Sequence, residues 1–218
     1  MNKVNIFLIS ILVLALIVLG ITLIQQKKNS TNDMVKLITD EKILDKSFNF
    51  SKIVYDIVKR NKLTLANENN TIIITWQMYI PNIGGEFYWT SNYTKDKPII
   101  RIGKSPHIYY NAKQNKLKII AKYQHSTFDN HYPLIELSNI NLQKWNTYTV
   151  IIQNYKIRIY INGKLQLSKQ LDNGIDIDDY KTSNVMLGEV NNNLFGKIRN
   201  FNLHFKNLSH NKLSSLNL

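Results

Sequence analysis

The sequence predicts an all-β domain, built as a sandwich of two antiparallel sheets, behind an N-terminal transmembrane helix. The first observation behind this prediction is an uncharged apolar run at Ile6–Ile24. The second is a series of short segments from Thr71 onward in which apolar and polar residues alternate, as in a half-buried strand. The third is that almost no helical periodicity separates these segments, which is typical of a sandwich or a barrel.

The apolar run Ile6–Ile24 is long enough to cross a bilayer as a helix. Its 19 residues cover about 28 Å at about 1.5 Å per residue, close to the ~30 Å hydrocarbon core. A cleaved signal peptide is the alternative, but its apolar region is shorter and ends in small residues. Val18-Leu19-Gly20 is a weak cleavage candidate, because the apolar run continues beyond it. We therefore expect an uncleaved signal-anchor, a single-pass membrane protein, and an N-terminal tail at 1–5.

The chain is strongly basic and contains no cysteine. Its formal net charge is +13, and Lys3, Lys27 and Lys28 flank the apolar run, so the rest carries 25 basic and 15 acidic residues, or +10. Such a charge attracts polyanions. However, the chain is rich in Lys, Asn, Ile and Tyr, which all have A/T-rich codons. This composition explains the excess of basic residues without a partner. We expect no nucleic acid partner. The lack of cysteine excludes disulfides, thiolate metal sites and a cysteine nucleophile.

Residues 25–60 connect the anchor to the β domain, which we expect at 61–218. This connecting segment is mostly polar, with short apolar clusters. Thr31-Asn32-Asp33 is a candidate helix cap. The short helix that it would start runs through Met34, Leu37, Ile38 and Leu44. We therefore expect a stalk or linker with a short helix.

The expected strands of the β domain follow one another at short spacing. In Thr71–Ile80 five apolar residues share one face, which we expect to point inward; they are Ile72, Ile74, Trp76, Met78 and Ile80. The other expected strands are Ile99–Ile102, Ile108–Tyr110, Leu117–Tyr123, Trp145–Gln153, Lys156–Ile161, Val185–Leu187 and Lys197–Phe205.

A β-hairpin is the most specific local prediction in this series. Lys156–Ile161 alternates strictly between polar and apolar residues. Asn162-Gly163 then forms a two-residue turn, because both residues tolerate positive φ. After the turn, we expect Leu165 and Leu167 to resume the inward face.

Three stretches together carry a resemblance to a known family. They are Leu142-Gln143-Lys144-Trp145 with the hairpin Ile157–Leu165, the strand Thr71–Ile80, and Phe195–Phe201 followed by Leu208-Ser209. Over roughly residues 62–215 the chain resembles concanavalin A-like, laminin G-like domains. It is most similar to those encoded by large DNA viruses of eukaryotes, often behind an N-terminal anchor. The resemblance implies a jelly-roll of two antiparallel sheets but no single function, because one fold hosts many functions.

Catalytic chemistry finds little support in the sequence. Some concanavalin A-like folds are glycosidases, and these carry a Glu-x-Asp-x-(x)-Glu run, because retaining hydrolysis uses two carboxylates about 5 Å apart. No such run is present. We therefore expect a non-enzymatic domain without catalytic residues.

Metal binding is also weakly supported. The main acidic cluster consists of Asp172, Asp176, Asp178 and Asp179. It offers hard oxygen ligands for Ca²⁺, but its composition is also that of a solvated turn, which we favour. His125 and His131 on either side of Asp129 match no standard zinc spacing. We expect no metal and no cofactor.

Aromatic side chains are the remaining candidates for ligand contact. We select Tyr88 and Trp89, which follow two glycines, and Tyr109 and Tyr110, because such rings are amphipathic. Ordinary buried or half-buried tyrosines are the alternative. The sequence thus favours a membrane-anchored binding module for a glycan or a protein, on a virion or host membrane if the chain is viral. The alternative is a structural or scaffold membrane protein of a virion with protein contacts only.

Overall fold

The computed structural model describes two compact units, Met1–Met34 and Val35–Leu218. The described residues are 16–22, 34–44, 47–60, 71–81, 95–103, 105–121, 134–153, 155–171, 174, 184–189, 194 and 196–204. In the first unit, residues 16–22 are helical, and the rest of the expected anchor lies outside the described residues. No helix within the described part of the chain is long and apolar enough to cross a membrane.

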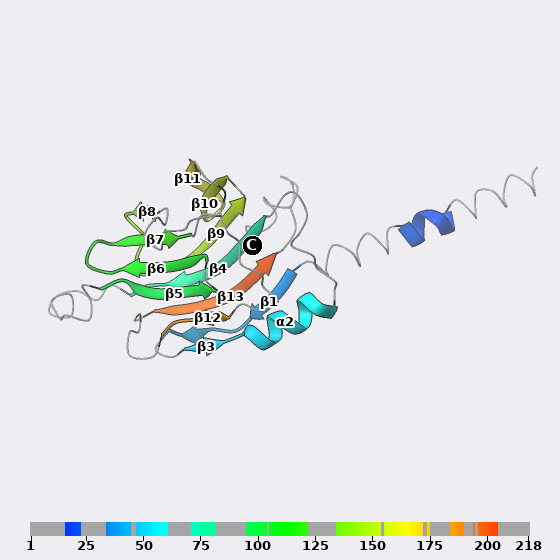
Figure 1. Cartoon of the computed structure of the whole chain (residues 1–218), viewed down its shortest axis with the longest axis horizontal. Coiled ribbons are helices and arrows are strands. Elements are labelled where there is room, and N and C mark those ends of the chain that lie inside the picture. The colour runs from blue at the N-terminus through cyan, green and yellow to red at the C-terminus, as the bar shows by residue number, and fades with distance from the viewer. Residues whose placement is uncertain are drawn as a thin grey trace, which may run out of the picture. The chain divides into compact units, whose positions relative to one another are not determined.

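The second unit is a sandwich of two sheets (Figure 1). The 7-stranded sheet has the order β1-β13-β4-β9-β10-β11, with β2 also paired to β13. Its strands are β1 Met34–Ile38, β2 Lys42–Ile43, β4 Ile72–Tyr79, β9 Trp145–Gln153, β10 Lys156–Ile161, β11 Lys164–Gln170 and β13 Lys197–His204. Every pair in this sheet whose register is described is antiparallel.

The 6-stranded sheet has the order β3-β12-β5-β6-β7-β8. Its strands are β3 Phe48–Asn49, β5 Lys97–Ile102, β6 His107–Asn111, β7 Lys116–Ile120, β8 Leu134–Ser138 and β12 Val185–Leu187. Its described pairs are antiparallel as well. The expected fold class, a two-sheet antiparallel β-sandwich of the jelly-roll kind, is confirmed.

One hydrophobic core lies between the sheets. The five residues expected inward in the strand around Trp76 are all buried, and burial alternates from Trp76 to Tyr79 as expected. In the first half of the strand, Ile73 and Thr75 on the other face are buried as well. The Trp76 indole stacks on the ring of Tyr148 from β9, with centroids 5.2 Å apart and planes 12° apart. β8, which is not among the strands expected from the sequence, completes the 6-stranded sheet.

The short helix expected through Met34 and Leu44 is wrong. The chain there forms β1 and β2, because both strands gain partners in the 7-stranded sheet and this pairing outweighs a weak local helix signal. Leu44 is fully buried, and its N–H donates to Gly196 O at 2.9 Å. Residues 35–44 therefore belong to the compact sandwich unit rather than to a separate stalk.

The helix of this region lies further on, at Ser51–Arg60 (α2). Asn49 Oδ1 accepts a hydrogen bond from Ser51 N at 2.9 Å, which satisfies one of the free amides at the helix start. Val54 anchors the helix because its side chain is fully buried.

The inward direction expected for Leu165 is also wrong, and a β-bulge explains why. Ile159 pairs with Leu167 and Tyr160 with Leu165, so Gln166 is an extra residue between the two pairs. The extra residue places Leu167 opposite inward-facing Ile159 and leaves Leu165 opposite outward-facing Tyr160. Leu165 is accordingly 53% exposed, while Leu167 packs against the core.

Candidate functional site

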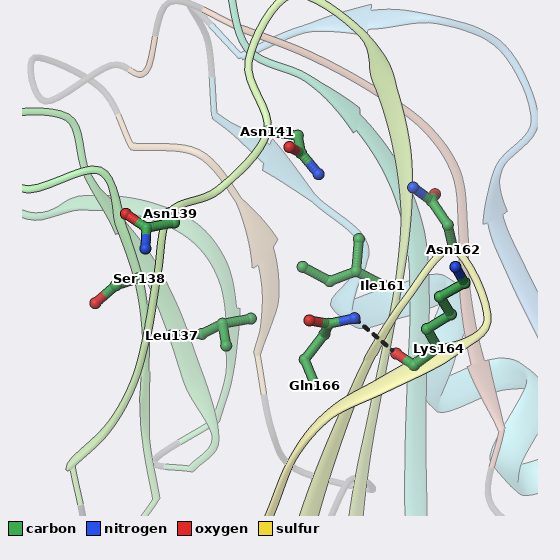
Figure 2. A pocket seen from close by; sticks show the side chains of 8 residues that line it. All are labelled: Leu137, Ser138, Asn139, Asn141, Ile161, Asn162, Lys164 and Gln166. Carbon is green, nitrogen blue, oxygen red and sulfur yellow. Dashed lines mark hydrogen bonds between the residues drawn. The ribbon is translucent and has the colours of Figure 1, made fainter.

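A pocket of about 250 Å³ opens beside the strands that end the two sheets, β8 and β11 (Figure 2). One wall is the end of β8 and the loop that follows it, and the other is the β10–β11 turn. The lining residues are Leu137, Ser138, Asn139, Asn141, Ile161, Asn162, Lys164 and Gln166. The pocket therefore forms only where two segments distant in sequence meet.

The lining combines an apolar centre with an amide-rich rim. Leu137 and Ile161 point into the pocket from opposite walls (Figure 2). Most of the remaining lining side chains are amides, and each amide offers both a hydrogen-bond donor and an acceptor. Among the described lining residues there is no carboxylate, and Lys164 is the one charged residue. Such a surface suits a neutral ligand that presents both hydroxyl groups and apolar C–H groups.

The turn that forms one wall is fixed by its own side chain. Asn162 and Gly163 have φ of 47° and 76°, the left-handed geometry of the predicted two-residue turn. Asn162 Oδ1 accepts a hydrogen bond from Thr147 N at 2.8 Å, and Asn162 Nδ2 donates to Asn146 Oδ1 at 3.0 Å. The predicted Asn-Gly turn is thus confirmed, and it holds the hairpin end against β9.

The opposite wall is held by the buried side chain of Asn146. Its Nδ2 donates to Asn141 O at 2.9 Å and to Lys144 O at 3.2 Å. Asn115 Nδ2 donates a hydrogen bond to Ile140 O of the same loop at 3.0 Å. Asn146 therefore joins both walls, because it bonds to the loop through its nitrogen and to Asn162 through its oxygen.

Two amides of the rim are left available. Among the described residues, none hydrogen-bonds the side chain of Asn139 or of Asn141, and both side chains are exposed. Gln166 Nε2 donates to Lys164 O at 3.3 Å, while its oxygen has no partner in the described part of the chain. These groups can bond to a ligand without first breaking a hydrogen bond to another described residue.

Of the four residues selected from the sequence, the two that the structure describes do not line the pocket. Tyr88 and Trp89 are outside the described residues. Tyr110 is 1% exposed, and its hydroxyl donates to Asn115 Oδ1 at 2.9 Å, so its ring is part of the core. Tyr109 faces outward on β6, half-buried, with its hydroxyl 3.4 Å from His107 Nδ1. Neither tyrosine lines the pocket.

The surface around Tyr109 carries a network of charged side chains. Lys118 Nζ lies 3.0 Å from Asp96 Oδ1 and 3.7 Å from Glu136 Oε1, and Lys116 Nζ lies 2.8 Å from Glu136 Oε2. The hydrogen bond from Lys116 lowers the pKa of Glu136. A glycosidase acid needs a raised pKa, so Glu136 does not suit this role.

Metal ligands are not gathered in the described part of the molecule. Within the described ranges, no group of three or more His, Asp or Glu side chains could hold a metal ion. The acidic cluster at Asp176 and the pair His125 and His131 lie outside these ranges.

Comparison with known proteins identifies the family. The family model described as the concanavalin A-like lectin/glucanases superfamily matches residues 66–214. No protein of curated function matches the sequence.

Solved structures support the same fold at low sequence identity. The receptor binding domain of the botulinum neurotoxin C/D mosaic serotype is 18% identical, with a TM-score of 0.55, over 84% of this chain and 43% of that one. The botulinum neurotoxin serotype G binding domain is 15% identical, with a TM-score of 0.54, over 84% of this chain and 45% of that one. The chain thus spans less than half the length of either structure. Because the family model covers most of the chain, the protein belongs to the concanavalin A-like lectin/glucanases superfamily.

Proposed function

We propose that this chain is a membrane-anchored, non-enzymatic binding module whose pocket between β8 and the β10–β11 turn recognises a neutral glycan. The observation that carries this proposal is a set of amide groups around two apolar side chains, none of which has a hydrogen-bond partner among the described residues. They are the side-chain amides of Asn139 and Asn141 and the side-chain oxygen of Gln166, and the apolar side chains are Leu137 and Ile161.

Glycan chemistry matches this lining. A sugar ring presents hydroxyl groups that both donate and accept hydrogen bonds, and an amide can accept from and donate to such groups. Its C–H groups form apolar patches that contact Leu137 and Ile161. The pocket, at about 250 Å³, is smaller than typical sites for drug-sized ligands, which measure about 300–1,000 Å³. We therefore expect it to take a single sugar residue at the end or side of a longer chain.

The comparisons motivate a binding role. The similar structures are binding or receptor binding domains of botulinum neurotoxins. A further one, the botulinum neurotoxin serotype D ligand binding domain, 16% identical with a TM-score of 0.50, was solved in complex with N-acetylneuraminic acid. At these identities the likeness supports the fold, and the step to ligand binding is part of our proposal.

A glycan array with the full-length chain, purified in mild detergent, identifies the saccharide. Its affinity is then measured for Asn141→Ala and Gln166→Ala. Each variant removes one hydrogen-bonding group, worth about 1 kcal/mol, so we expect each to weaken binding about fivefold. Gln170→Ala is the matched control, because Gln170 is an exposed amide on the same strand that does not line the pocket.

Two results would count against the proposal. One is a chain that retains its fold but binds no saccharide, while cross-linking in membranes gives protein partners only. That result would favour the scaffold alternative. The other is an equal loss of affinity in Gln170→Ala, which would place the ligand away from the pocket.

Membrane anchoring through residues 6–24, and display on a viral or host membrane, are also part of the proposal. The supporting observation is the uncharged apolar run in the sequence. Alkaline carbonate extraction of membranes that carry the full chain should leave it in the pellet. Protease protection then reports which side the β domain occupies. Release into the supernatant would refute the anchor without affecting the pocket.

A further inference from the structure

Three neighbouring strands of the 7-stranded sheet gather a second group of side chains on its outer face. β13, β4 and β9 lie side by side, and their register places Arg199, Gln77 and Thr147 in one row. The adjacent row consists of Lys197, Tyr79 and Trp145. These side chains point away from the core, because buried Trp76 and Met78 alternate with Gln77 and Tyr79 along β4. None of them lines the pocket.

The guanidinium of Arg199 is held in place by its neighbours. Its Cζ lies 4.2 Å from the ring centroid of Trp145, a cation–π contact. Arg199 Nε donates to Gln77 Oε1 at 2.8 Å, and Gln77 Nε2 donates to Thr147 Oγ1 at 3.2 Å. The side chain is thus fixed on one face by the indole and on one edge by the amide.

The other edge of this guanidinium is available. Neither Nη of Arg199 has a hydrogen-bond or ion-pair partner among the described residues. The one carboxylate described beside this row, that of Glu41, lies 2.7 Å from Lys197 Nζ instead. An arginine edge with two N–H groups side by side matches the two oxygens of a carboxylate or sulfate.

Aromatic surface lies next to the available edge. The rings of Tyr79 and Trp145 have centroids 5.9 Å apart with a tilt of 47°, and both side chains are half-buried. Such rings offer an apolar contact for the C–H face of a sugar. A nucleic acid would instead need many phosphate contacts, whereas this cluster holds one cation that no described carboxylate neutralises.

We propose that the Arg199 cluster, formed by Arg199, Trp145, Tyr79 and Gln77, is a second ligand site that binds an acidic saccharide. The Arg199 Nη groups hold the carboxylate or sulfate, and the sugar ring contacts Tyr79 and the exposed edge of Trp145. This site is independent of the neutral-glycan pocket.

Isothermal titration of the full-length chain in mild detergent tests the proposal. The probes are sialyllactose for a carboxylate, a sulfated heparin disaccharide for a sulfate, and lactose as the neutral control. We expect at least one acidic probe to bind about tenfold or more tightly than lactose. Arg199→Gln and Arg199→Lys should each weaken that binding about tenfold, because lysine keeps the charge but cannot bond in bidentate fashion.

Arg158→Gln is the matched control. Arg158 lies on the same outer face, on β10, and donates to Gln153 Oε1 at 3.1 Å without an aromatic ring in a described contact. Its loss removes the same charge and should change affinity by no more than about twofold. Gln166→Ala, which affects the pocket, should leave binding of the acidic probe unchanged. Circular dichroism and the thermal midpoint confirm that each variant is folded.

Several outcomes overturn the proposal. Equal affinity for lactose and the acidic probes would remove the role of the anion. Unchanged binding in folded Arg199→Gln and Arg199→Lys would show that the Arg199–Trp145 stack is structural only. An equal loss in Arg158→Gln would indicate attraction to net charge, and binding to phosphatidylserine vesicles alone would identify a lipid surface instead of a saccharide.

Discussion

Asn146→Ala should lower stability and loosen the pocket at the same time. The side chain is 1% exposed and makes three hydrogen bonds, with Asn141 O, Lys144 O and Asn162 Nδ2. At about 1 kcal/mol each, the three bonds are worth about 3 kcal/mol. Water can reach the exposed Asn141 and Asn162 after the substitution, so we expect a loss of about 2 kcal/mol. For a chain of this size that corresponds to a fall in Tm of about 4–8 °C.

Urea unfolding of the full chain, followed by circular dichroism, measures this loss. Asn141→Ala is the control, because its side-chain amide bonds to no described residue and its removal should change stability by less than about 0.5 kcal/mol. Asn146→Ala should also weaken saccharide binding although Asn146 does not line the pocket, because both walls of the pocket lose their common contact. A loss below about 0.5 kcal/mol in Asn146→Ala would refute the view that this residue joins the walls.

Two further predictions test the outer parts of the 7-stranded sheet. Burial lowers the pKa of His204 to about 4, against 6.5 in the unfolded chain, so the unfolded state binds the proton first as pH falls. The contribution of His204 to the free energy of unfolding should be fully present above pH 6.5 and fall by up to roughly 3 kcal/mol toward pH 4. In His204→Phe, the free energy of unfolding measured with urea should depend less on pH in that window. If the pH dependence of the free energy of unfolding is the same in His204→Phe, other groups are its cause. In β11, Leu165→Ser should change stability by less than about 0.5 kcal/mol and Leu167→Ser by about 1–2 kcal/mol; equal effects would contradict the bulge.

The period of the strands made much of the fold predictable. The Asn162-Gly163 turn and the alternation from Trp76 to Tyr79 are local signals, and both appear in the structure as expected. The bulge at Gln166 was not predictable, because it is a property of the register between two strands. β1 was mistaken for a helix because its pairing with β13, distant in sequence, decides its structure.

The candidate sites were less predictable, for a similar reason. Leu137 and Ile161 are far apart in sequence and meet only where the two sheets end side by side. The two selected tyrosines of β6 could not both belong to a surface site, because adjacent residues of a strand point to opposite faces. Tyr109 and Tyr110 are neighbours on one strand, so they point to opposite faces and cannot both be exposed. The asparagines after β8 were a visible signal, but asparagine is too frequent in this chain for the signal to stand out.

The most direct test of the central claim is a crystal structure of the full chain with the saccharide that binds most tightly on the array. We predict a sugar residue between Leu137 and Ile161, with hydroxyl groups bonded to the amides of Asn141 and Gln166. A neutral saccharide bound on any other surface, with this pocket empty, would contradict the claim.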